Sequence, residues 1–540
     1  MHSSLRNIFE NTRVYLWAHC ILAIWIFLCF MGGLNNFFAG DDFDWLFDAV
    51  KLFHHPFSIF KLQGIFVRPL ETLFFFCNLA VAGANPLFHH LASLLVHIAN
   101  VILVSCFINY VCNNRLAGLI GALYWGLNYK HSEVVFMSYA ISDAQVLLMF
   151  LGAFLLFFRR QLLLTTTLFM IGLLAKENAV VFPGILFLYI CLCREDHQRQ
   201  WLKRTTPLWC VACGYLVMRY SVSAGGGGSS YLSFTWDVFP HFWENLLSLI
   251  GPDATFVKQV WFSTTANLLP VWFAISLFLL AAVVWWTFSP IYRFGCVWIG
   301  VTMLPTLFIF YQTSRYRYIP LVGLAILVGQ GVSELLMFLH EKHAVKICLK
   351  CVYGTFILIL GYFIIGIYVE EQDYDYFGAM HRQAAESFQQ DILPHIAQDR
   401  HIMAVFFDQD SMKWSKLLQH RFSSKPWYVP ATYKWVYRRP HGVLGLSNTY
   451  GFVSYCAYNS QTGQLFVNVP YKEYQEDMLE GNFYIINHDS KANTFSLGDA
   501  VLKKDLIDYS GDHGLYRFLQ PGQFDPTGQG GLDLHIASEY

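Results

Sequence analysis

Charged residues are scarce in this sequence. Only 14% of its 540 residues are Asp, Glu, Lys or Arg, whereas 55% are hydrophobic and 18% are aromatic. One water-soluble core of this length would need far more polar surface, so the composition indicates a membrane protein with many spans. The charges also nearly cancel, with a formal net charge of -1, which argues against nucleic acid as a partner.

The sequence also lacks the cysteine spacing of a disulfide-rich or zinc-binding protein. Cys456 is the one cysteine of the polar C-terminal part, so no disulfide can form within that part. The pairs Cys210/Cys213 and Cys348/Cys351 have no His or further Cys at ligand spacing. Chance placement in apolar segments explains them better than metal or redox chemistry.

Long apolar runs are abundant instead. The first, Ile21 to Phe38, is long enough to span a bilayer, and no small-residue cleavage site follows it, so we expect a retained anchor. Ten further spans are predicted at 86–111, 116–128, 138–158, 161–175, 178–193, 205–223, 267–288, 294–311, 318–339 and 351–369. The fold class that follows is a polytopic α-helical membrane protein with about 11 transmembrane helices within residues 1–370.

Basic residues at the ends of these runs predict the orientation. Arg6 and Arg13 precede the first span, which places the N-terminus in the cytoplasm under the positive-inside rule. The connections on the same predicted side carry Arg115, Arg159, Arg160, Arg194, Arg199, Lys203, Arg204, Arg293, Lys342, Lys346 and Lys350. Because no endoplasmic-reticulum signal is evident, we expect a bacterial inner (cell) membrane.

Outer segments complete the predicted organisation. Residues 37–85 form a first outer loop, and residues 224–266 form a second that is rich in glycine, either a lid over a site or a plain linker. Residues 371–540 are predicted to be a soluble extracytoplasmic α+β domain. We expect its elements to be a helix at 374–391, a strand at 401–407 and hairpins at 451–469 and 482–497.

Three carboxylates, Asp41, Asp42 and Asp44, directly follow the first span. Charge at the end of a membrane helix is costly, and carboxylates clustered there typically hold a proton, a cation or a substrate. The alternative is an acidic helix cap, because Asp stabilises the start of a helix. We assign Asp44 to capping and keep both interpretations for Asp41 and Asp42.

Polar turns are predicted where several short spans end. Segments such as 116–128 and 162–174 are shorter than the ~20 residues that cross a bilayer, so their outer ends would lie below the membrane surface and line a cavity. The turns are Tyr129 to Glu133, Ala175 to Asn178 and Ser314 to Tyr318. We expect these turns to face one another, with Asp143 one to two turns inside the fourth span.

Acids in the first outer loop and bases in later outer turns suit the transfer of a sugar from a polyprenyl-phosphate carrier. A carboxylate would take the proton from an acceptor hydroxyl as its oxygen attacks the anomeric carbon. The departing phosphate needs cationic hydrogen-bond donors, which Lys and Arg supply. Attack opposite the leaving phosphate would invert the anomeric centre.

Several motifs resemble one family. Asp41-Asp42 is similar to the acidic signature of the GT-C superfamily of membrane glycosyltransferases. A longer run resembles its protein O-mannosyltransferase-like and tetratricopeptide-linked mannosyltransferase branch, although this chain lacks the repeats. The similar stretches are Arg68-Pro69-Leu70, Asn78, Asn85-Pro86, His90 through His97, His131-Ser132-Glu133, Asp143, Lys176-Glu177, Pro183 and Arg317-Tyr318-Ile319-Pro320.

The resemblance implies a GT-C-like domain with a lipid-linked sugar donor and a glycan, lipid or protein acceptor. Its catalytic base would be Asp41 or Asp42, with Asp41 slightly favoured. Carried over by position, the donor phosphate would contact Lys176, Arg315 and Arg317, and the acceptor or sugar pocket would be formed by Arg68, His131, Glu133, Asp143 and Glu177. No cofactor is required, although a divalent cation (Mg or Mn) bridging Asp41 and Asp42 to the phosphate is compatible with the pattern.

Simpler interpretations of the same residues stay open. Arg315 and Arg317 would only snorkel at a helix end, and Lys176 with Glu177 would form a mutually neutralising turn. Arg68 and Glu71, three apart, would be an ordinary helical ion pair. The histidines at 89, 90 and 97 are better explained by packing than by metal binding.

Two other functions compete with the glycosyltransferase. A transporter or flippase for lipid-linked saccharides would also have a charged cavity, but it should show paired repeats and charges at both membrane faces. A scaffold that only presents the C-terminal part would explain neither the charges nor the many spans. The clustering of charge at one face favours the enzyme.

Overall fold

The structure is a computed structural model. It describes residues 11–39, 41–53, 55–60, 68–194, 198–223, 289–309, 313–341 and 346–387, short stretches between 242 and 249, and ten strands between 402 and 518. The chain divides into two compact units, the first Met1–Asn35, Phe60–Phe74 and Leu87–Tyr374, the second Asn36–Ile59, Phe75–Pro86 and Asp375–Tyr540. The predicted span at 267–288 lies outside the described residues, as does almost all of the predicted loop at 224–266.

The first unit is helical. Its α-helices are α2 Thr12–Phe30, α5 Pro86–Cys112, α6 Arg115–Gly126, α7 Ser132–Phe136, α8 Ile141–Phe158, α9 Leu162–Ala175, α10 Phe182–Cys193, α11 Gln198–Arg204, α12 Thr206–Ser223, α16 Pro290–Leu307, α17 Leu321–Glu341 and most of α18 Lys346–Ser387. Short 3-10 helices connect them: η1 Met31–Asn35, η3 Tyr129–His131, η4 Ser138–Ala140, η5 Glu177–Val181 and η8 Ser314–Arg317. Each predicted span within the described residues therefore coincides with a helix.

The first helix begins earlier than the sequence predicts. It starts at Thr12 rather than Ile21, because the side chain of Asn11 caps it by accepting a hydrogen bond from the backbone N–H of Arg13. Regular α-helix ends at Phe30, just before Gly32 and Gly33. The expected start at Ile21 is therefore wrong, whereas the membrane-spanning segment, counted through η1, ends at Asn35, close to the expected Phe38.

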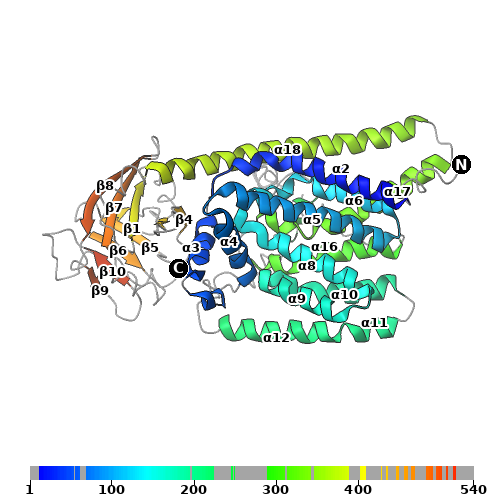
Figure 1. The fold of residues 1–540 in the computed structure, drawn as a ribbon, viewed down its shortest axis with the longest axis horizontal. Helices are drawn as coiled ribbons and strands as arrows, with labels where there is room; N and C mark the ends of the chain where they lie inside the picture. Colours follow the sequence, from blue (N-terminus) through cyan, green and yellow to red (C-terminus); the bar gives the residue numbers. More distant parts are fainter. Residues whose placement is uncertain are drawn as a thin grey trace, which may run out of the picture. The chain divides into compact units, whose positions relative to one another are not determined.

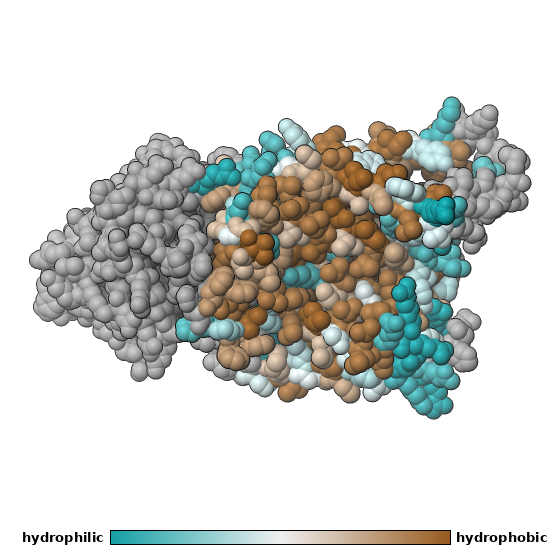
Figure 2. Space-filling view, viewed as in Figure 1, coloured by the Kyte–Doolittle hydropathy of each residue, from teal (hydrophilic) through white to brown (hydrophobic). Residues whose placement is uncertain are grey.

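Five of the described helical segments are long and apolar enough to cross a membrane: Thr12–Asn35, Pro86–Cys112, Ser138–Phe158, Leu321–His340 and Cys348–Asp375. Three shorter apolar helices, Pro69–Ala82, Leu162–Ala175 and Glu177–Cys193, accompany them. Large apolar side chains are exposed on α2, α12 and α18, such as Trp17, Tyr220 and Leu358. Figure 2 shows the resulting apolar face, as expected for an integral membrane protein. The count of eleven spans stays a prediction.

Close helix contacts in this unit depend on glycine. Helix α6 packs on α17, and α17 packs on α16 (Figure 1). A Cβ at Gly121 would lie 2.7 Å from the carbonyl oxygen of Ala325, and one at Gly323 would lie 2.6 Å from that of Gly295. Small residues of this kind let membrane helices approach backbone to backbone.

The second unit contains helix α3 Asp42–Leu52, part of helix α4 Pro69–Ala82, and the strands of the C-terminal part. The strands form a three-stranded sheet in the order β1-β7-β8, a five-stranded sheet in the order β2-β5-β6-β10-β9 and the pair β3-β4 (Figure 1). Their bounds are Ile402–Asp408, Trp427–Tyr428, Tyr433–Trp435, Leu446–Asn448, Tyr455–Asn459, Gln464–Asn468, Asn482–Asp489, Thr494–Val501, Leu506–Asp508 and Leu515–Phe518.

Two antiparallel hairpins occur where the sequence predicts them. Strands β5 and β6 pair with Asn459 opposite Gln464, and β7 pairs with β8 with Asp489 opposite Thr494. The expected separate helix at 374–391 is instead the end of α18, which continues unbroken to Ser387. The treatment of residues 371–540 as a separate soluble domain stays a prediction.

Candidate functional site

The candidate site lies at one set of helix ends in the first unit. Helices α6 and α9 end there, at Gly126 and Ala175, and α8, α10 and α17 begin there. Helix α6 has 12 residues, which makes it about 18 Å long against ~30 Å of bilayer hydrocarbon. Its polar turn therefore has room to lie below the membrane surface, as the sequence predicts.

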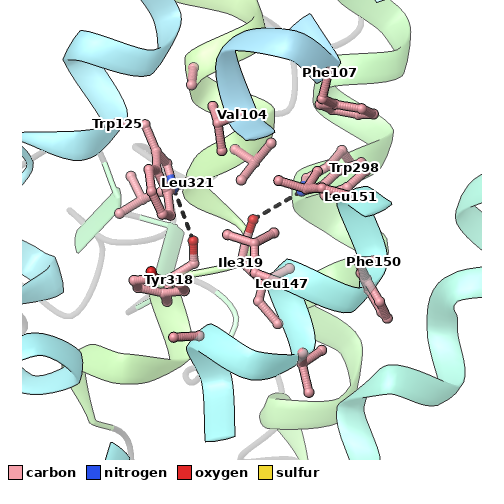
Figure 3. Close-up of a cluster of buried hydrophobic side chains, with 14 of the residues drawn as sticks. Val104, Phe107, Trp125, Leu147, Phe150, Leu151, Trp298, Tyr318, Ile319 and Leu321 are labelled. Atoms are coloured by element: carbon pink, nitrogen blue, oxygen red, sulfur yellow. Dashed lines mark hydrogen bonds between the residues drawn. The ribbon is translucent and has the colours of Figure 1, made fainter. Parts of the chain in front are cut away.

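A buried aromatic layer holds the start of α17 beneath the site. The indole Nε1 of Trp125 donates to the carbonyl oxygen of Tyr318 at 3.2 Å, and that of Trp298 donates to the carbonyl oxygen of Ile319 at 2.9 Å (Figure 3). These bonds satisfy carbonyl groups that would otherwise be buried without partners. They also tie α6 and α16 to the segment that follows Arg315 and Arg317.

The Tyr318 hydroxyl connects this aromatic layer to helix α5. Asn100 donates to it at 3.2 Å, and it lies 2.9 Å from Nδ1 of His97. Nε2 of His97 lies 3.1 Å from the carbonyl oxygen of Gly126, which can only accept, so Nε2 carries the proton and Nδ1 accepts from Tyr318. The expectation that His97 serves packing is consistent with these contacts.

Glu133 holds the third predicted turn. Its Oε2 accepts from the hydroxyl of Ser314 at 2.6 Å and from the backbone N–H of Arg315 at 2.9 Å. Its Oε1 lies 3.7 Å from Nε of Arg315. The first and third polar turns therefore meet, as predicted, and Arg315 is paired rather than snorkelling.

Lys176 pairs with Asp143, not with its neighbour Glu177. Nζ of Lys176 lies 2.6 Å from Oδ2 of Asp143, and the amide of Asn178 donates to Oδ1 at 3.3 Å. Both charged side chains are almost fully buried, at 4% and 1% exposed. The interpretation of Lys176 and Glu177 as a self-neutralising turn is wrong, because the extended backbone at Lys176 directs the two side chains to different partners.

Glu177 pairs with Arg68 rather than with Lys176. Nε and Nη2 of Arg68 donate to the two carboxylate oxygens of Glu177 at 3.3 and 2.9 Å, which is the planar two-bond geometry that a guanidinium prefers. Glu71 lies in the first turn of α4, three residues after Arg68, and its Oε2 is 3.6 Å from Nη1 of Arg68. The expected ion pair of Arg68 and Glu71 is present, but Glu177 is the stronger partner.

Three cations therefore converge at these helix ends: Arg68, Lys176 and Arg315. Burial lowers the pKa of Lys176, Asp143 raises it in part, and Arg315 and Arg68 lower it further. Burial acts to lower the pKa of Arg315, but Glu133, Tyr316, Tyr139 and Asp143 together raise it well above its ordinary value. Like charges this close are unfavourable unless anions lie between them.

Aromatic rings complete the surroundings of these cations. Tyr316 lies under both Lys176 and Arg315, with its ring centroid 5.3 Å from Nζ and 5.8 Å from Cζ. Tyr139 lies 5.1 Å from Cζ of Arg315. These contacts place the second predicted turn against the third, and a cation over a ring face is further stabilised there.

The predicted acids Asp41 and Asp42 belong to the second unit. Asp42 is buried, and its Oδ2 accepts from the backbone N–H of Ala39 at 3.1 Å at the start of α3. Asp41 is exposed. The carboxylate of Asp42 therefore holds the segment before α3, capping of α3 stays a prediction, and Asp41 is exposed. The side chain of Asp44 lies outside the described residues.

The remaining predicted residues are buried. His131 in η3 is fully enclosed, with its ring centroid 4.4 Å from that of Trp125 and 4.7 Å from that of Tyr318. Burial, followed by the nearby His97, lowers the pKa of His131 well below its ordinary value, so the ring is neutral. Arg317 is 2% exposed. Within the described ranges, no three His, Cys, Asp or Glu residues are grouped to hold a metal ion, and a cation at Asp41 and Asp42 stays a prediction.

Sequence reasoning missed several partners in this site. Asn178 lies in the second predicted turn, and Ser314 and Tyr316 lie in the third. Their hydrogen bonds and ring contacts are made to segments far apart in the sequence, so the sequence did not reveal them. Glu71 was assigned only to a local ion pair. A carboxyl at the first turn of a largely apolar helix is the signal that marks it.

No protein-family model matches the sequence, and no curated protein matches it. Among solved structures, the fold is similar to ArnT from Cupriavidus metallidurans bound to undecaprenyl phosphate, with 11% identity, a TM-score of 0.45, and 74% of this chain and 83% of that chain covered. It is also similar to the oligosaccharyltransferase AglB from Archaeoglobus fulgidus in complex with an inhibitory peptide and a dolichol-phosphate, with 12% identity, a TM-score of 0.46, and 89% and 70% covered.

Proposed function

We propose that this chain is an inverting glycosyltransferase of the GT-C kind. It moves a sugar from a polyprenyl-phosphate donor to an acceptor hydroxyl at the outer face of the membrane. The observation that carries the proposal is the convergence of Arg68, Lys176 and Arg315 at one set of helix ends. A lipid phosphate lies at that level when its tail is in the bilayer, and it needs several cationic donors as it leaves.

The exposed fractions of the three cationic side chains indicate which of them can reach a bound phosphate. The side chains of Arg68 and Arg315 are 13% and 12% exposed, whereas that of Lys176 is 4% exposed and tightly bound to Asp143. Arg68 and Arg315 therefore contact the phosphate first, and Lys176 adds its charge from behind. The loosest carboxylate contact is the 3.7 Å pair of Glu133 with Arg315, so this pair opens most readily for a phosphate oxygen.

Asp41 is the proposed general base. Unlike Asp42, it is exposed at the start of α3, and its carboxylate is not the one that accepts from Ala39. Asp41 would remove the proton of the acceptor hydroxyl while the polyprenyl phosphate departs from the opposite face of the anomeric carbon. His131, Glu133, Asp143 and Glu177 remain proposed to shape the sugar or acceptor pocket, and Arg317 to support the phosphate.

Turnover by the full-length protein in lipid nanodiscs tests this function. The protein is given polyprenyl-phosphate mannose or polyprenyl-phosphate glucose, and released polyprenyl phosphate is followed by mass spectrometry. We expect Asp41→Asn to lower turnover by at least about a hundredfold, the contribution of a general base, while donor binding persists. The matched control is Asp48→Asn, on the same helix α3, which should keep turnover.

Two results would contradict the proposal. One is an Asp41→Asn protein that turns over as fast as the wild type. The other is a wild-type protein that binds these donors and carries them across vesicle membranes without releasing polyprenyl phosphate, which is the behaviour of a flippase.

A further inference from the structure

Among the described residues, Glu71 is the carboxyl near the three cations whose oxygens accept no hydrogen bond from them. Both of its oxygens are buried and make no hydrogen bond, and its contact with Arg68 is 3.6 Å long. Its side chain is 0% exposed. An ionised carboxylate in that position is costly, because desolvation is not offset by hydrogen bonds.

The pairing of the cations explains why Glu71 is left over. Lys176 is bonded to Asp143, Arg315 to Glu133, and Arg68 to Glu177 through two bonds. Three cations are thus matched by three carboxylates, and Glu71 is the fourth carboxyl. Among these seven groups, three cations and four carboxyls, the charges cancel only while Glu71 is neutral.

We propose that Glu71 sets the affinity of this cation cluster for phosphate. It remains a neutral carboxylic acid while Arg68, Lys176 and Arg315 accept the phosphate of a polyprenyl phosphate, and its ionisation weakens their hold. The proton passes to water, and no bond other than O–H is broken. This inference rests on the proposed function and adds to it a positioning residue that acts through Arg68.

The electrostatic surroundings of Glu71 agree with this geometry. Burial raises the pKa of Glu71 to about 8, although the positive charges of Arg68, Lys176 and Arg315 act to lower it. Asp143, on α8, acts in the same direction as burial. The groups that face Glu71 thus come from the segment before α4, the turn between α9 and η5, η8 and α8, and its charge changes close to physiological pH.

The pH dependence of phosphate binding tests the proposal. Binding of polyprenyl phosphate to the full-length protein in nanodiscs is measured from about pH 6 to about pH 9, on both sides of the pKa of about 8. Relative to a variant that cannot ionise at position 71, wild-type affinity should fall about tenfold or more over this range, because one added charge several ångströms from the phosphate has an effect of this order. The phosphate's own titration is shared by all variants and cancels in the comparison.

Substitutions separate this role from a structural one. Glu71→Gln keeps the shape but cannot ionise, so its affinity should exceed that of the wild type about tenfold at high pH and should not fall there. Glu71→Asp should keep a pH dependence. The control Glu334→Gln removes a carboxylate that accepts from Tyr292 and Gln330 in the same unit, and its profile should match the wild type.

A second measurement is independent of the lipid. Infrared spectra near neutral pH should show a protonated-carboxyl band that Glu71→Gln removes. Competition by inorganic phosphate would show that the cluster binds the phosphate group itself, and failure to compete would assign the site to the lipid-linked form.

The outcomes that overturn the inference are distinct. Equal pH profiles for wild type and Glu71→Gln, or an infrared band that survives the substitution, overturn the role of Glu71 and leave the glycosyltransferase intact. A wild-type protein that binds no polyprenyl phosphate at any pH overturns both proposals.

Discussion

Basic residues at the two ends of the helices in the first unit have different surroundings. At the end where α8, α10 and α17 begin, Lys176 and Arg315 are buried and paired with carboxylates from other segments. At the opposite end, Arg159, Arg160 and Lys203 are exposed. Exposed basic residues need only water and obey the positive-inside rule, whereas buried charges persist only where pairing offsets their desolvation. This difference is the physical basis for proposing the functional site at the first end.

The sharpest way to break this comparison is to remove one partner of a buried pair. Asp143→Ala leaves Lys176 buried beside Arg315 and Arg68 without its carboxylate. We expect a loss of about 3–5 kcal/mol in the free energy of unfolding, seen as a lower melting temperature of the protein in nanodiscs. The double variant Asp143→Ala/Lys176→Met removes both charges and should recover most of the loss. A single variant as stable as the wild type would show that the pair is not buried as described.

A smaller effect is expected from changing the geometry of a cation while keeping its charge. Arg68→Lys cannot reproduce the two parallel bonds to Glu177. Its affinity for polyprenyl phosphate should fall about tenfold, or about 1.4 kcal/mol, measured by ligand binding in nanodiscs. Arg159→Lys, at the opposite end, should bind as the wild type does, and equal loss in both variants would refute the distinction between the ends.

The free energy of unfolding should depend on pH through the ionisation of Glu71. In the unfolded chain this carboxyl has its ordinary pKa of 4.5, whereas burial in the folded protein raises that pKa to about 8. The stabilising contribution is therefore complete below about 4.5 and is lost as pH rises through about 8. Relative to the wild type, Glu71→Gln should gain several degrees in melting temperature between about pH 6 and about pH 9. A constant difference between the two proteins across this range would contradict the raised pKa.

The smallest effect is expected from substituting an exposed basic residue at the opposite end of the helices. Arg159→Gln should change the melting temperature by no more than about 1 °C, because an exposed charge contributes little to stability. A change comparable to that of Asp143→Ala would mean that both ends are built alike.

Local patterns in the sequence predicted the helices well. Apolar runs place most of the described helices of the first unit within a few residues, apart from the first and the last, because a helix in a bilayer must satisfy its own backbone and be apolar over its length. The start of α2 was missed because a single side chain, Asn11, caps it well before the apolar run. The boundary between the last span and the polar tail was missed because α18 continues as a helix after its composition changes.

The candidate site was predicted in its members but not in its pairings. The sequence selected Lys176, Asp143, Glu133 and Arg315 because charges are rare near apolar runs. As one alternative it paired Lys176 with the adjacent Glu177, whereas the folded chain pairs Lys176 with Asp143. Adjacent side chains leave an extended backbone in opposite directions, so pairing is decided by which distant segment faces each one.

By itself, the sequence determined that this is a membrane protein, where its helices run and which turns carry charge, because these properties follow from the hydropathy and length of continuous segments. Only the tertiary structure decided that Arg68 serves Glu177, that Glu133 holds the turn of Arg315 and that Glu71 is left without a hydrogen bond. Such pairings join residues about 110 to 180 positions apart, and they form because burial forces each charge to find whichever partner the packed helices bring within reach.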